Sequence, residues 1–239
     1  MGPGVRPLPE DRSVAPPTAR TGAVRSPHRF LHLLAAQLGL ILVYPFVADD
    51  RPMPAVAAGF VLAIFVAALW VVAGERRVRV VATLLVIPTI VANLLSAAAP
   101  DRYPILPAVA FGTVFLGFIT VVIFRGVVQS RTVTTETLYG AITAYLLLGI
   151  TWAWGYVLVE QLHPGAFRCA SAADGRVVPP DLTFLSFITL TSVGYGDIVP
   201  VSRHARALAI LEAVAGQMYL AVFVARLVGM HGRGAADRR

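Results

Sequence analysis

Residues 191–197 read TSVGYGD, a stretch in which Gly194 and Gly196 stand on either side of one aromatic residue, Tyr195. A row of carbonyl groups that all point the same way requires backbone conformations with φ > 0, which glycine adopts at no steric cost. Val193 and Tyr195 alternate with the glycines and can turn outward to pack into the protein. A ring of such segments replaces the hydration shell of a cation with backbone oxygens. The stretch therefore predicts a narrow ion path lined by main-chain carbonyls.

The same stretch resembles the potassium-channel signature Thr-Val-Gly-Tyr-Gly, with Ser192 in the position of the threonine. The resemblance implies that the potassium ion (K⁺) is bound by the carbonyls of Ser192, Val193, Gly194 and Tyr195. It gives the ion-binding selectivity filter as Thr191, Ser192, Val193, Gly194, Tyr195 and Gly196. In this interpretation the Ser192 hydroxyl completes the innermost site, and the Thr191 hydroxyl faces the pore helix or the cavity. Serine lacks the threonine methyl group, so its hydroxyl rotates more freely at that site.

Asp197 follows the filter, where the resemblance implies an acid that supports the outer mouth from behind. In many members of the family an aromatic residue on the pore helix holds this acid. The corresponding residues here are Phe184 and Leu185, and neither side chain can donate a hydrogen bond. We therefore expect the filter support of this chain, and its inactivation, to differ from those of better-known members.

The composition indicates an integral membrane protein, because 57% of the residues are hydrophobic and the mean hydropathy is +0.73. The formal charge of +7 comes from arginine alone, and the arginines lie mostly between hydrophobic stretches, so a membrane explains them better than nucleic acid. No nucleophile elbow, zinc motif or phosphate loop is present. We therefore expect no enzymatic activity and no cofactor, with K⁺ as the permeant ion. The one cysteine, Cys169, is either a free thiol or the partner of its copy in a neighbouring subunit.

Hydrophobic stretches of about 20 residues predict membrane-spanning helices, since that length crosses ~30 Å of hydrocarbon. We expect six such spans, at residues 30–48, 53–74, 78–98, 104–124, 135–160 and 203–229. Residues 181–190 are apolar but too short to span, which suits a re-entrant pore helix with Asp181 as its N-cap. Near the end of the fifth span, Trp152, Trp154 and Tyr156 are interpreted as an interfacial aromatic belt. The fold class is thus an all-α integral membrane protein with six transmembrane helices, one re-entrant pore helix and a selectivity filter.

Four regions follow from this interpretation. They are a disordered cytoplasmic N-terminal tail (1–29), a four-helix transmembrane region (30–125), a potassium-channel pore module (132–230) and a short cytoplasmic tail (231–239). The N-terminal tail is rich in proline and arginine and has too few large apolar residues to fold. With both termini inside, fourteen of the twenty arginines lie on the cytoplasmic side. We therefore expect a multi-pass protein of the cell membrane with its N- and C-termini in the cytoplasm.

Three residues of the last span are further candidates. Gly216 is either a gating hinge or a position where helices approach closely. Glu212, one turn earlier, is either a charge near the cavity or a protonated or hydrogen-bonded acid behind the pore helix, bonded to Ser186 or Thr189. The second interpretation of Glu212 is favoured. Gln217 either lines the cavity or bridges helices.

One chain supplies one filter stretch, whereas a potassium filter needs four around one axis, so we expect a homotetramer in the lipid bilayer with no nucleic-acid partner. The span at 104–124 has no charged residue, which predicts a voltage-insensitive channel of the bacterial kind. The first four spans are then a scaffold or a docking surface, and an unknown gating ligand or protein remains open. Two alternatives are a weakly selective monovalent cation channel, which Ser192 allows, and the membrane subunit of a K⁺ uptake system. Such subunits carry four degenerate pore loops in one chain, and this chain has one.

Overall fold

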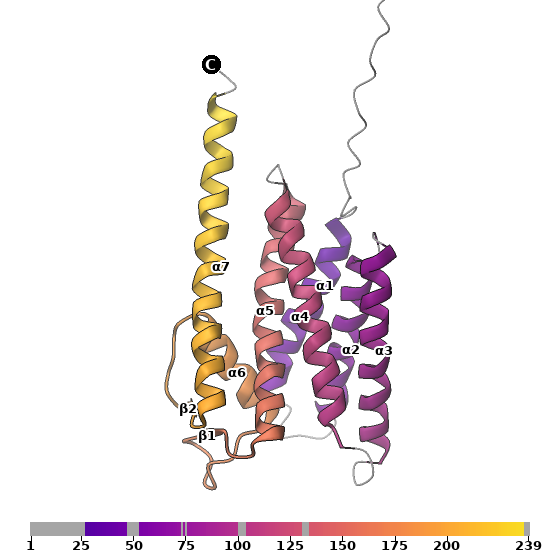
Figure 1. Cartoon of the computed structure of the whole chain (residues 1–239), viewed down its shortest axis with the longest axis vertical. Helices are drawn as coiled ribbons and strands as arrows, with labels where there is room; N and C mark the ends of the chain where they lie inside the picture. The colour runs from indigo at the N-terminus through magenta and orange to yellow at the C-terminus, as the bar shows by residue number, and fades with distance from the viewer. Residues whose placement is uncertain are drawn as a thin grey trace, which may run out of the picture.

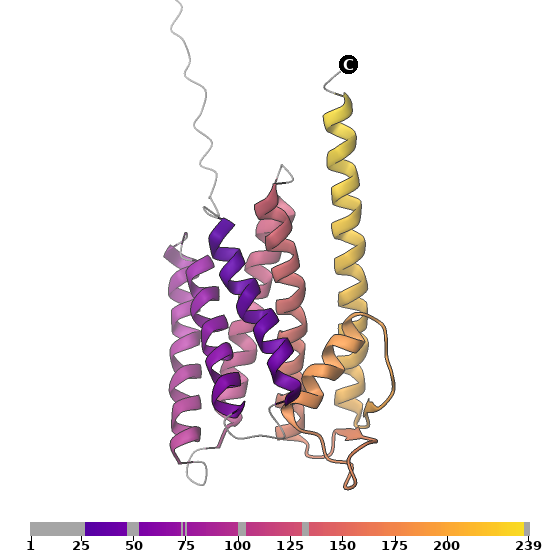
Figure 2. The same cartoon turned by 180° about the vertical axis from the view of Figure 1, so that it is seen from behind.

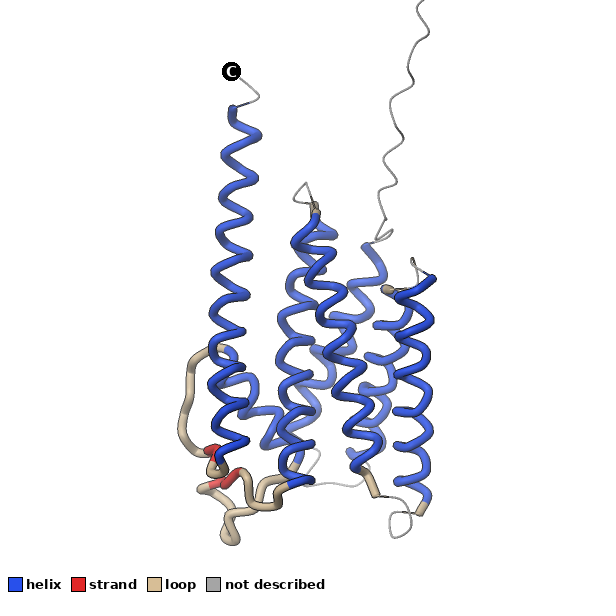
Figure 3. Tube along the Cα trace, viewed as in Figure 1, coloured by secondary structure: helices blue, strands red, loops and turns tan. Residues whose placement is uncertain are grey.

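A computed structural model describes residues 27–46, 53–72, 74, 76–99, 104–130 and 134–236, and most of them are helical (Figure 3). The helices are α1 (Pro27–Val43), α2 (Met53–Val71), α3 (Arg76–Ala98), α4 (Leu106–Gln129), α5 (Thr135–Leu162), α6 (Pro179–Leu190) and α7 (Arg203–Ala236). A short 3₁₀ helix, η1 (Tyr44–Phe46), continues α1, and two strands, β1 (Phe167–Cys169) and β2 (Ile198–Pro200), flank α6 in the sequence.

The long elements are almost wholly apolar. In lipid no water can bond to the backbone, so such segments form helices, which satisfy their own backbone hydrogen bonds. Four of the described helices, α3, α4, α5 and α7, are long and apolar enough to cross a membrane. The apolar segments of α1 with η1 and of α2 are shorter, at Phe30–Phe46 and Ala58–Val71. The described part of the chain is therefore that of a mainly helical membrane protein.

The long helices run side by side in alternating directions (Figures 1 and 2). The starts of α1, α3 and α5 lie at one end of the bundle, together with the ends of α2, α4 and α7. Helices α1–α4 gather on one side of α5, and α7 stands on the other side, with α6 between α5 and α7 at the opposite end. Helix α7 extends well beyond the other helices, so much of its length has no neighbour in the chain.

One apolar core joins the four N-terminal helices to α5. Leu116 of α4 and Leu147 of α5 are fully buried in it. Gly112 of α4 makes room for the Trp154 ring of α5, since a methyl group on Gly112 would lie 2.2 Å from a ring carbon. Tyr156 is also fully buried. The prediction that Tyr156 belongs to an interfacial belt is therefore wrong, because its side chain is fully buried, whereas Trp154 is only half-buried and its place in the belt stays a prediction.

Hydrogen bonds also fasten the neighbouring helices to α5. The buried Gln37 of α1 donates its side-chain Nε2 to the Thr143 carbonyl at 3.3 Å, and the hydroxyls of Thr120 and Thr151 lie 3.1 Å apart between α4 and α5. Such interhelical bonds stabilise membrane bundles by about 0.6 kcal/mol on average. Helices α1, α4 and α5 are thus joined by polar as well as apolar contacts.

From its middle onward, helix α7 contacts α5 and the end of α4. The Tyr219 hydroxyl donates to the Ala141 carbonyl at 2.6 Å, and the Tyr219 ring lies 5.3 Å from the Tyr145 ring. About two turns further along, the Arg226 guanidinium donates to the Ser130 carbonyl at the end of α4. These contacts fix the distance between α7 and the rest of the bundle.

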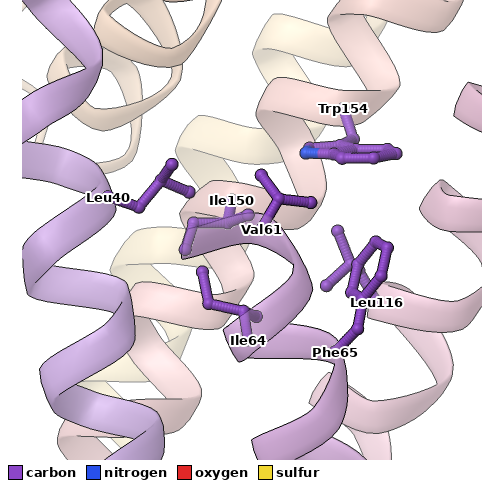
Figure 4. Close-up of a pocket in the computed structure, with 7 residues that line it drawn as sticks. All are labelled: Leu40, Val61, Ile64, Phe65, Leu116, Ile150 and Trp154. Atoms are coloured by element: carbon purple, nitrogen blue, oxygen red, sulfur yellow. The ribbon is translucent and has the colours of Figure 1, made fainter. Parts of the chain in front are cut away.

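A small void lies between α1, α2, α4 and α5, and every side chain around it is apolar (Figure 4). It is lined by Leu40, Val61, Ile64, Phe65, Leu116, Ile150 and Trp154. The space left between them has no room for a water molecule. We therefore regard it as ordinary core packing and not as a ligand site.

Several helix ends differ from the boundaries expected from hydropathy. Helix α1 begins at Pro27, three residues inside the expected disordered tail, because proline at a first helical position lacks an N–H that would have no partner anyway. The rest of that tail, residues 1–26, lies outside the described residues. Helix α4 continues past Arg125 to Gln129, and α7 continues past residue 229 to Ala236. Hydropathy predicts where a helix is apolar, but the helix can continue into polar residues beyond that part.

Candidate functional site

The candidate site begins at the N-terminus of α6, where a reciprocal pair of bonds starts the helix. Val178 is the N-cap, and Pro179 and Pro180 take the first two helical positions. The Asp181 carboxylate accepts a hydrogen bond from the Val178 N–H at 2.9 Å. Asp181 is therefore a first-turn residue and not the N-cap that the sequence predicted, because the prolines start the helix two residues earlier. Its charge still interacts favourably with the helix dipole.

At its other end α6 turns the chain back by main-chain hydrogen bonds. The N–H groups of Val193 and Gly194 both donate to the Ile188 carbonyl, at 2.8 and 3.1 Å. The N–H of Ser192 donates to the Thr189 carbonyl at 3.0 Å. In a planar trans peptide the C=O points opposite to the N–H of the same unit. The carbonyls of Ser192 and Val193 therefore point away from α6.

Three residues of the filter stretch have left-handed backbone conformations. Gly194 has φ 55° and Gly196 has φ 81°, which confirms the conformations predicted for these glycines. Ser192 has φ 59°, and no other non-glycine residue in the described part of the chain has φ > 0. A left-handed L-residue costs roughly 1–2 kcal/mol, and the sequence gave no signal for it here. The two hydrogen bonds to Ile188 hold the chain in this turn.

The side chains of the filter stretch are open to the surroundings of the single chain. Val193 is 51% exposed and Tyr195 is 72% exposed. The Tyr195 ring is parallel to the Phe184 ring of α6, with centroids 6.2 Å apart. Within one chain, the Phe184 ring therefore lies against the Tyr195 ring, and most of the Tyr195 side chain is exposed.

Asp197 is held by the main chain and not by α6. Its carboxylate accepts from the N–H of Ile198 at 3.0 Å, and its carbonyl accepts from the N–H of Ala170 at 2.7 Å. Phe184 and Leu185 make no hydrogen bond to the Asp197 side chain, as expected from their chemistry. The Asp197 end of the filter stretch is therefore fixed through the loop that precedes α6.

That loop is joined to the chain leaving the filter by a short antiparallel ladder. Strand β1 pairs with β2 in the register Phe167 opposite Pro200 and Cys169 opposite Ile198. Cys169 is buried, and its Sγ lies 3.0 Å from the Ser171 hydroxyl. A disulfide with a neighbouring subunit would require this side chain to leave its packing, so the free-thiol interpretation of Cys169 is the one that the structure favours.

Behind α6, three buried side chains from three helices meet. The Tyr156 hydroxyl of α5 donates to Glu212 Oε2 of α7. Ser186 of α6 lies with its Oγ 2.5 Å from Glu212 Oε1 and 2.7 Å from the Gly149 carbonyl. Tyr156, Ser186 and Glu212 are all fully buried. Of the two partners predicted for Glu212, Ser186 is the one found, and Tyr156 was missed because it was assigned to the membrane interface.

In the Tyr156–Ser186–Glu212 cluster, the number of available protons determines which group donates in each of the three contacts. The Gly149 carbonyl can only accept, so the Ser186 hydroxyl proton is directed there. The contact between Ser186 Oγ and Glu212 then requires a proton from the carboxyl group. A neutral Glu212 gives each of the three contacts one proton, whereas a carboxylate leaves one contact without any. The cluster fits the interpretation of Glu212 as a hydrogen-bonded acid behind the pore helix.

Gly216 lies one turn after Glu212, against the last residue of α6. A methyl group on Gly216 would lie 2.4 Å from the Leu190 carbonyl oxygen, which is backbone and cannot move aside alone. The Tyr145 hydroxyl contacts the same oxygen from α5 at 3.4 Å. This close approach supports the packing interpretation of Gly216, and the hinge interpretation remains a prediction.

We expect Gly216→Ala to destabilise the protein by about 1–3 kcal/mol, because overpacking would push α7 away from the end of α6. The melting temperature of the purified protein in detergent should fall by several degrees. Gly155→Ala is the matched control, since a methyl group there meets nothing within 4 Å and alanine favours a helix. Equal melting temperatures for the two variants would contradict the packing interpretation.

Two hydroxyls at the start of the filter stretch, those of Thr191 and Ser192, have separate partners. The Thr191 hydroxyl donates to the Phe187 carbonyl at 2.7 Å, so it faces the pore helix, one of the two directions expected. Gln217 of α7 donates its side-chain Nε2 to the Ser192 Oγ at 2.8 Å. Gln217 thus links α7 to the filter stretch and not to another helix, and its predicted role in lining the cavity stays a prediction.

Known proteins resemble the half of the chain that contains this site. Residues 144–231 match the family model described as an ion channel. The chain is 34% identical over 118 residues to protein LctB of Geobacillus stearothermophilus, covering 48% of this chain and 87% of that protein. It is 33% identical over 125 residues to protein LctB of Bacillus caldotenax, covering 48% and 92%. No solved structure matches the chain.

Proposed function

Because this chain belongs to the ion channel family, with protein LctB among its relatives, we propose that it is a potassium-selective channel through which K⁺ permeates passively. The observation that carries the proposal is the start of the filter stretch, where the N–H groups of Val193 and Gly194 bond to α6 and the carbonyls of Ser192 and Val193 therefore point away from it. Oxygens in such a row replace the water around the ion. The proposed ligands are the carbonyls of Ser192, Val193, Gly194 and Tyr195.

In this proposal α6 is the re-entrant pore helix and the chain crosses the membrane six times. Helix α6 has 12 residues, about 18 Å at 1.5 Å per residue, which is well short of the ~30 Å hydrocarbon core. The alternating directions of the six other helices support six crossings. The arginine distribution supports an orientation in the cell membrane with both termini in the cytoplasm and the Asp197 end of the filter outside.

The functional unit that we propose is a homotetramer. Each chain brings one filter stretch, and a closed ring of carbonyls needs four of them. The exposure of Val193 and Tyr195 in the single chain supports this assembly, because neighbouring subunits would cover them. The exposed apolar residues of α7, such as Ile210 at 65%, are accounted for in the same way.

We propose that residues 132–230 are the pore module and that residues 30–125 support it. The apolar core shared by α1–α4 and α5 is consistent with a scaffold. A scaffold of this kind also offers a surface on which lipid, a ligand or another protein can act on the pore. Removal of residues 1–130 would expose the buried face of α5, so a truncated channel needs a substitute for that contact.

The test is current measurement on the purified full-length protein in bilayers. We expect reversal potentials under bi-ionic conditions to favour K⁺ over Na⁺ by about tenfold or more, equivalent to roughly 1.4 kcal/mol. Ba²⁺, with a radius close to that of K⁺, should block the current. The mass of the protein, corrected for detergent, should be that of four chains.

Each alternative has its own outcome in these measurements. Equal permeability to Na⁺ and K⁺ would favour a weakly selective cation channel, which the Ser192 substitution allows. A monomeric mass would exclude a ring of four filter stretches and would return the K⁺ uptake subunit to consideration.

A further inference from the structure

The side chain of Gln217 touches the inner end of the filter stretch from α7. Its Nε2 donates to the Ser192 Oγ at 2.8 Å, and both residues are exposed on the surface of the chain. We propose that Gln217 is a positioning residue that fixes the Ser192 hydroxyl and so defines the innermost K⁺ site. The inference rests on the proposed potassium-channel function and deepens it.

The need for such a residue comes from Ser192 itself. A threonine has two heavy atoms on Cβ, and these restrict rotation about χ1. Serine has one, so its hydroxyl can move among three staggered positions. An ion ligand that moves in this way coordinates less well than one held in place. The hydrogen bond from the Gln217 amide thus restrains the Ser192 hydroxyl, as the methyl group of a threonine at position 192 would.

The position of Gln217 is fixed by its neighbour in the sequence. Gly216 packs against the Leu190 carbonyl at the end of α6, so α7 cannot slide or turn at this level without breaking that contact. The next side chain is thereby directed to the first residues of the filter. The Thr191 hydroxyl lies against the Phe187 carbonyl, to which it donates, and the Gln217 amide bonds to Ser192.

The hydrogen bond leaves Ser192 able to bind an ion. A hydroxyl oxygen has two acceptor lone pairs, and the Gln217 amide occupies one of them. The second lone pair stays available to a cation, while the hydroxyl proton turns elsewhere. Gln217 therefore orients the oxygen and does not replace it as a ligand.

The central experiment compares wild type with Gln217→Leu, which keeps a similar volume and removes the amide. Loss of one hydrogen bond that restrains the site should weaken Ba²⁺ block from the cytoplasmic side about fivefold or more and lower the K⁺/Na⁺ permeability ratio. Met218→Leu is the matched control, because Met218 is the adjacent residue in α7, is 58% exposed and carries no amide that could donate to Ser192. It should leave both quantities unchanged.

A rescue separates positioning from general damage to α7. In the Gln217→Leu background, Ser192→Thr restores an internal restraint on the hydroxyl and should bring Ba²⁺ block back to within about twofold of wild type. In a Ser192→Ala background there is no hydroxyl to position, so Gln217→Leu should have no further effect on Ba²⁺ block. A merely structural role of Gln217 would produce neither result.

The outcomes for the inference and for the proposed function are distinct. Ba²⁺ block equal in wild type and Gln217→Leu, or an effect of Gln217→Leu that persists in the Ser192→Ala background, would overturn the role of Gln217 and leave potassium selectivity standing. A wild-type protein that passes Na⁺ and K⁺ equally would overturn the proposed function. Rescue by Ser192→Thr, together with the absent effect in Ser192→Ala, would establish the inference.

Discussion

A channel carrying Gly194→Ala is expected to conduct no measurable K⁺ current. Gly194 has φ 55°, and an alanine there costs roughly 1–2 kcal/mol in each subunit. Four subunits contribute to one pore in the proposed assembly, so the strain is repeated four times around a single ion path. Rotation about the N–Cα bond would relieve it, but that rotation turns the Val193 carbonyl out of line with the Gly194 carbonyl.

The expected defect comes from backbone conformation and not from a clash. A methyl group on Gly194 would meet nothing within 4 Å in its own chain. The variant should therefore still express, and its mass should equal that of wild type. Gly59→Ala is the control, because Gly59 also has open space around it but is helical and exposed. Gly59→Ala should conduct normally, and normal K⁺ current through Gly194→Ala would show that residue 194 does not line the ion path.

The second large effect is expected at Glu212, where the replacement decides the outcome. Glu212→Leu leaves the Tyr156 hydroxyl buried without its acceptor, which should destabilise each subunit by about 1–3 kcal/mol. The melting temperature of the purified protein should fall clearly. Adding Tyr156→Phe should recover part of the loss, because removing both partners of a buried bond costs less than removing one.

Glu212→Gln should behave like wild type in the same assay. The side-chain carbonyl of glutamine can accept from Tyr156, and its amide can donate to the Ser186 Oγ, as the neutral carboxyl group does. Single-channel conductance should also be unchanged. A large fall in conductance with an unchanged melting temperature would instead show that Glu212 acts as a charge that concentrates cations near the cavity.

The sequence predicted those features of the site that depend on local residue chemistry. The stretch 191–197 was sufficient to predict left-handed glycines at 194 and 196, since few other residues take that conformation without strain. The short helix before the filter was predicted from ten apolar residues bounded by prolines and a polar loop. Hydropathy located the long helices, although it misjudged their ends at Pro27 and Gln129.

Contacts between distant segments were harder to predict, because they depend on how the helices rotate against one another. Tyr156 was assigned to the membrane interface, yet the rotation of α5 about its axis directs the Tyr156 side chain to Glu212, which lies 56 residues later in the sequence. The bond between Gln217 and Ser192 has the same origin. The left-handed conformation of Ser192 also had no sequence signal, because it results from two hydrogen bonds that reach back to Ile188.

The length of α7 gives it mechanical leverage. From Gly216, where α7 rests on the Leu190 carbonyl, Arg226 is about 15 Å away and Ala236 about 30 Å away along the helix. A tilt of about 10° around that resting point would swing Ala236 by about 5 Å but Arg226 by only about 3 Å, given a rise of 1.5 Å per residue. The bond from Arg226 to the Ser130 carbonyl would break within that swing. Gly216, beside the filter, is thus the pivot of such a tilt, and the bond from Arg226, halfway between Gly216 and Ala236, is the contact that resists it.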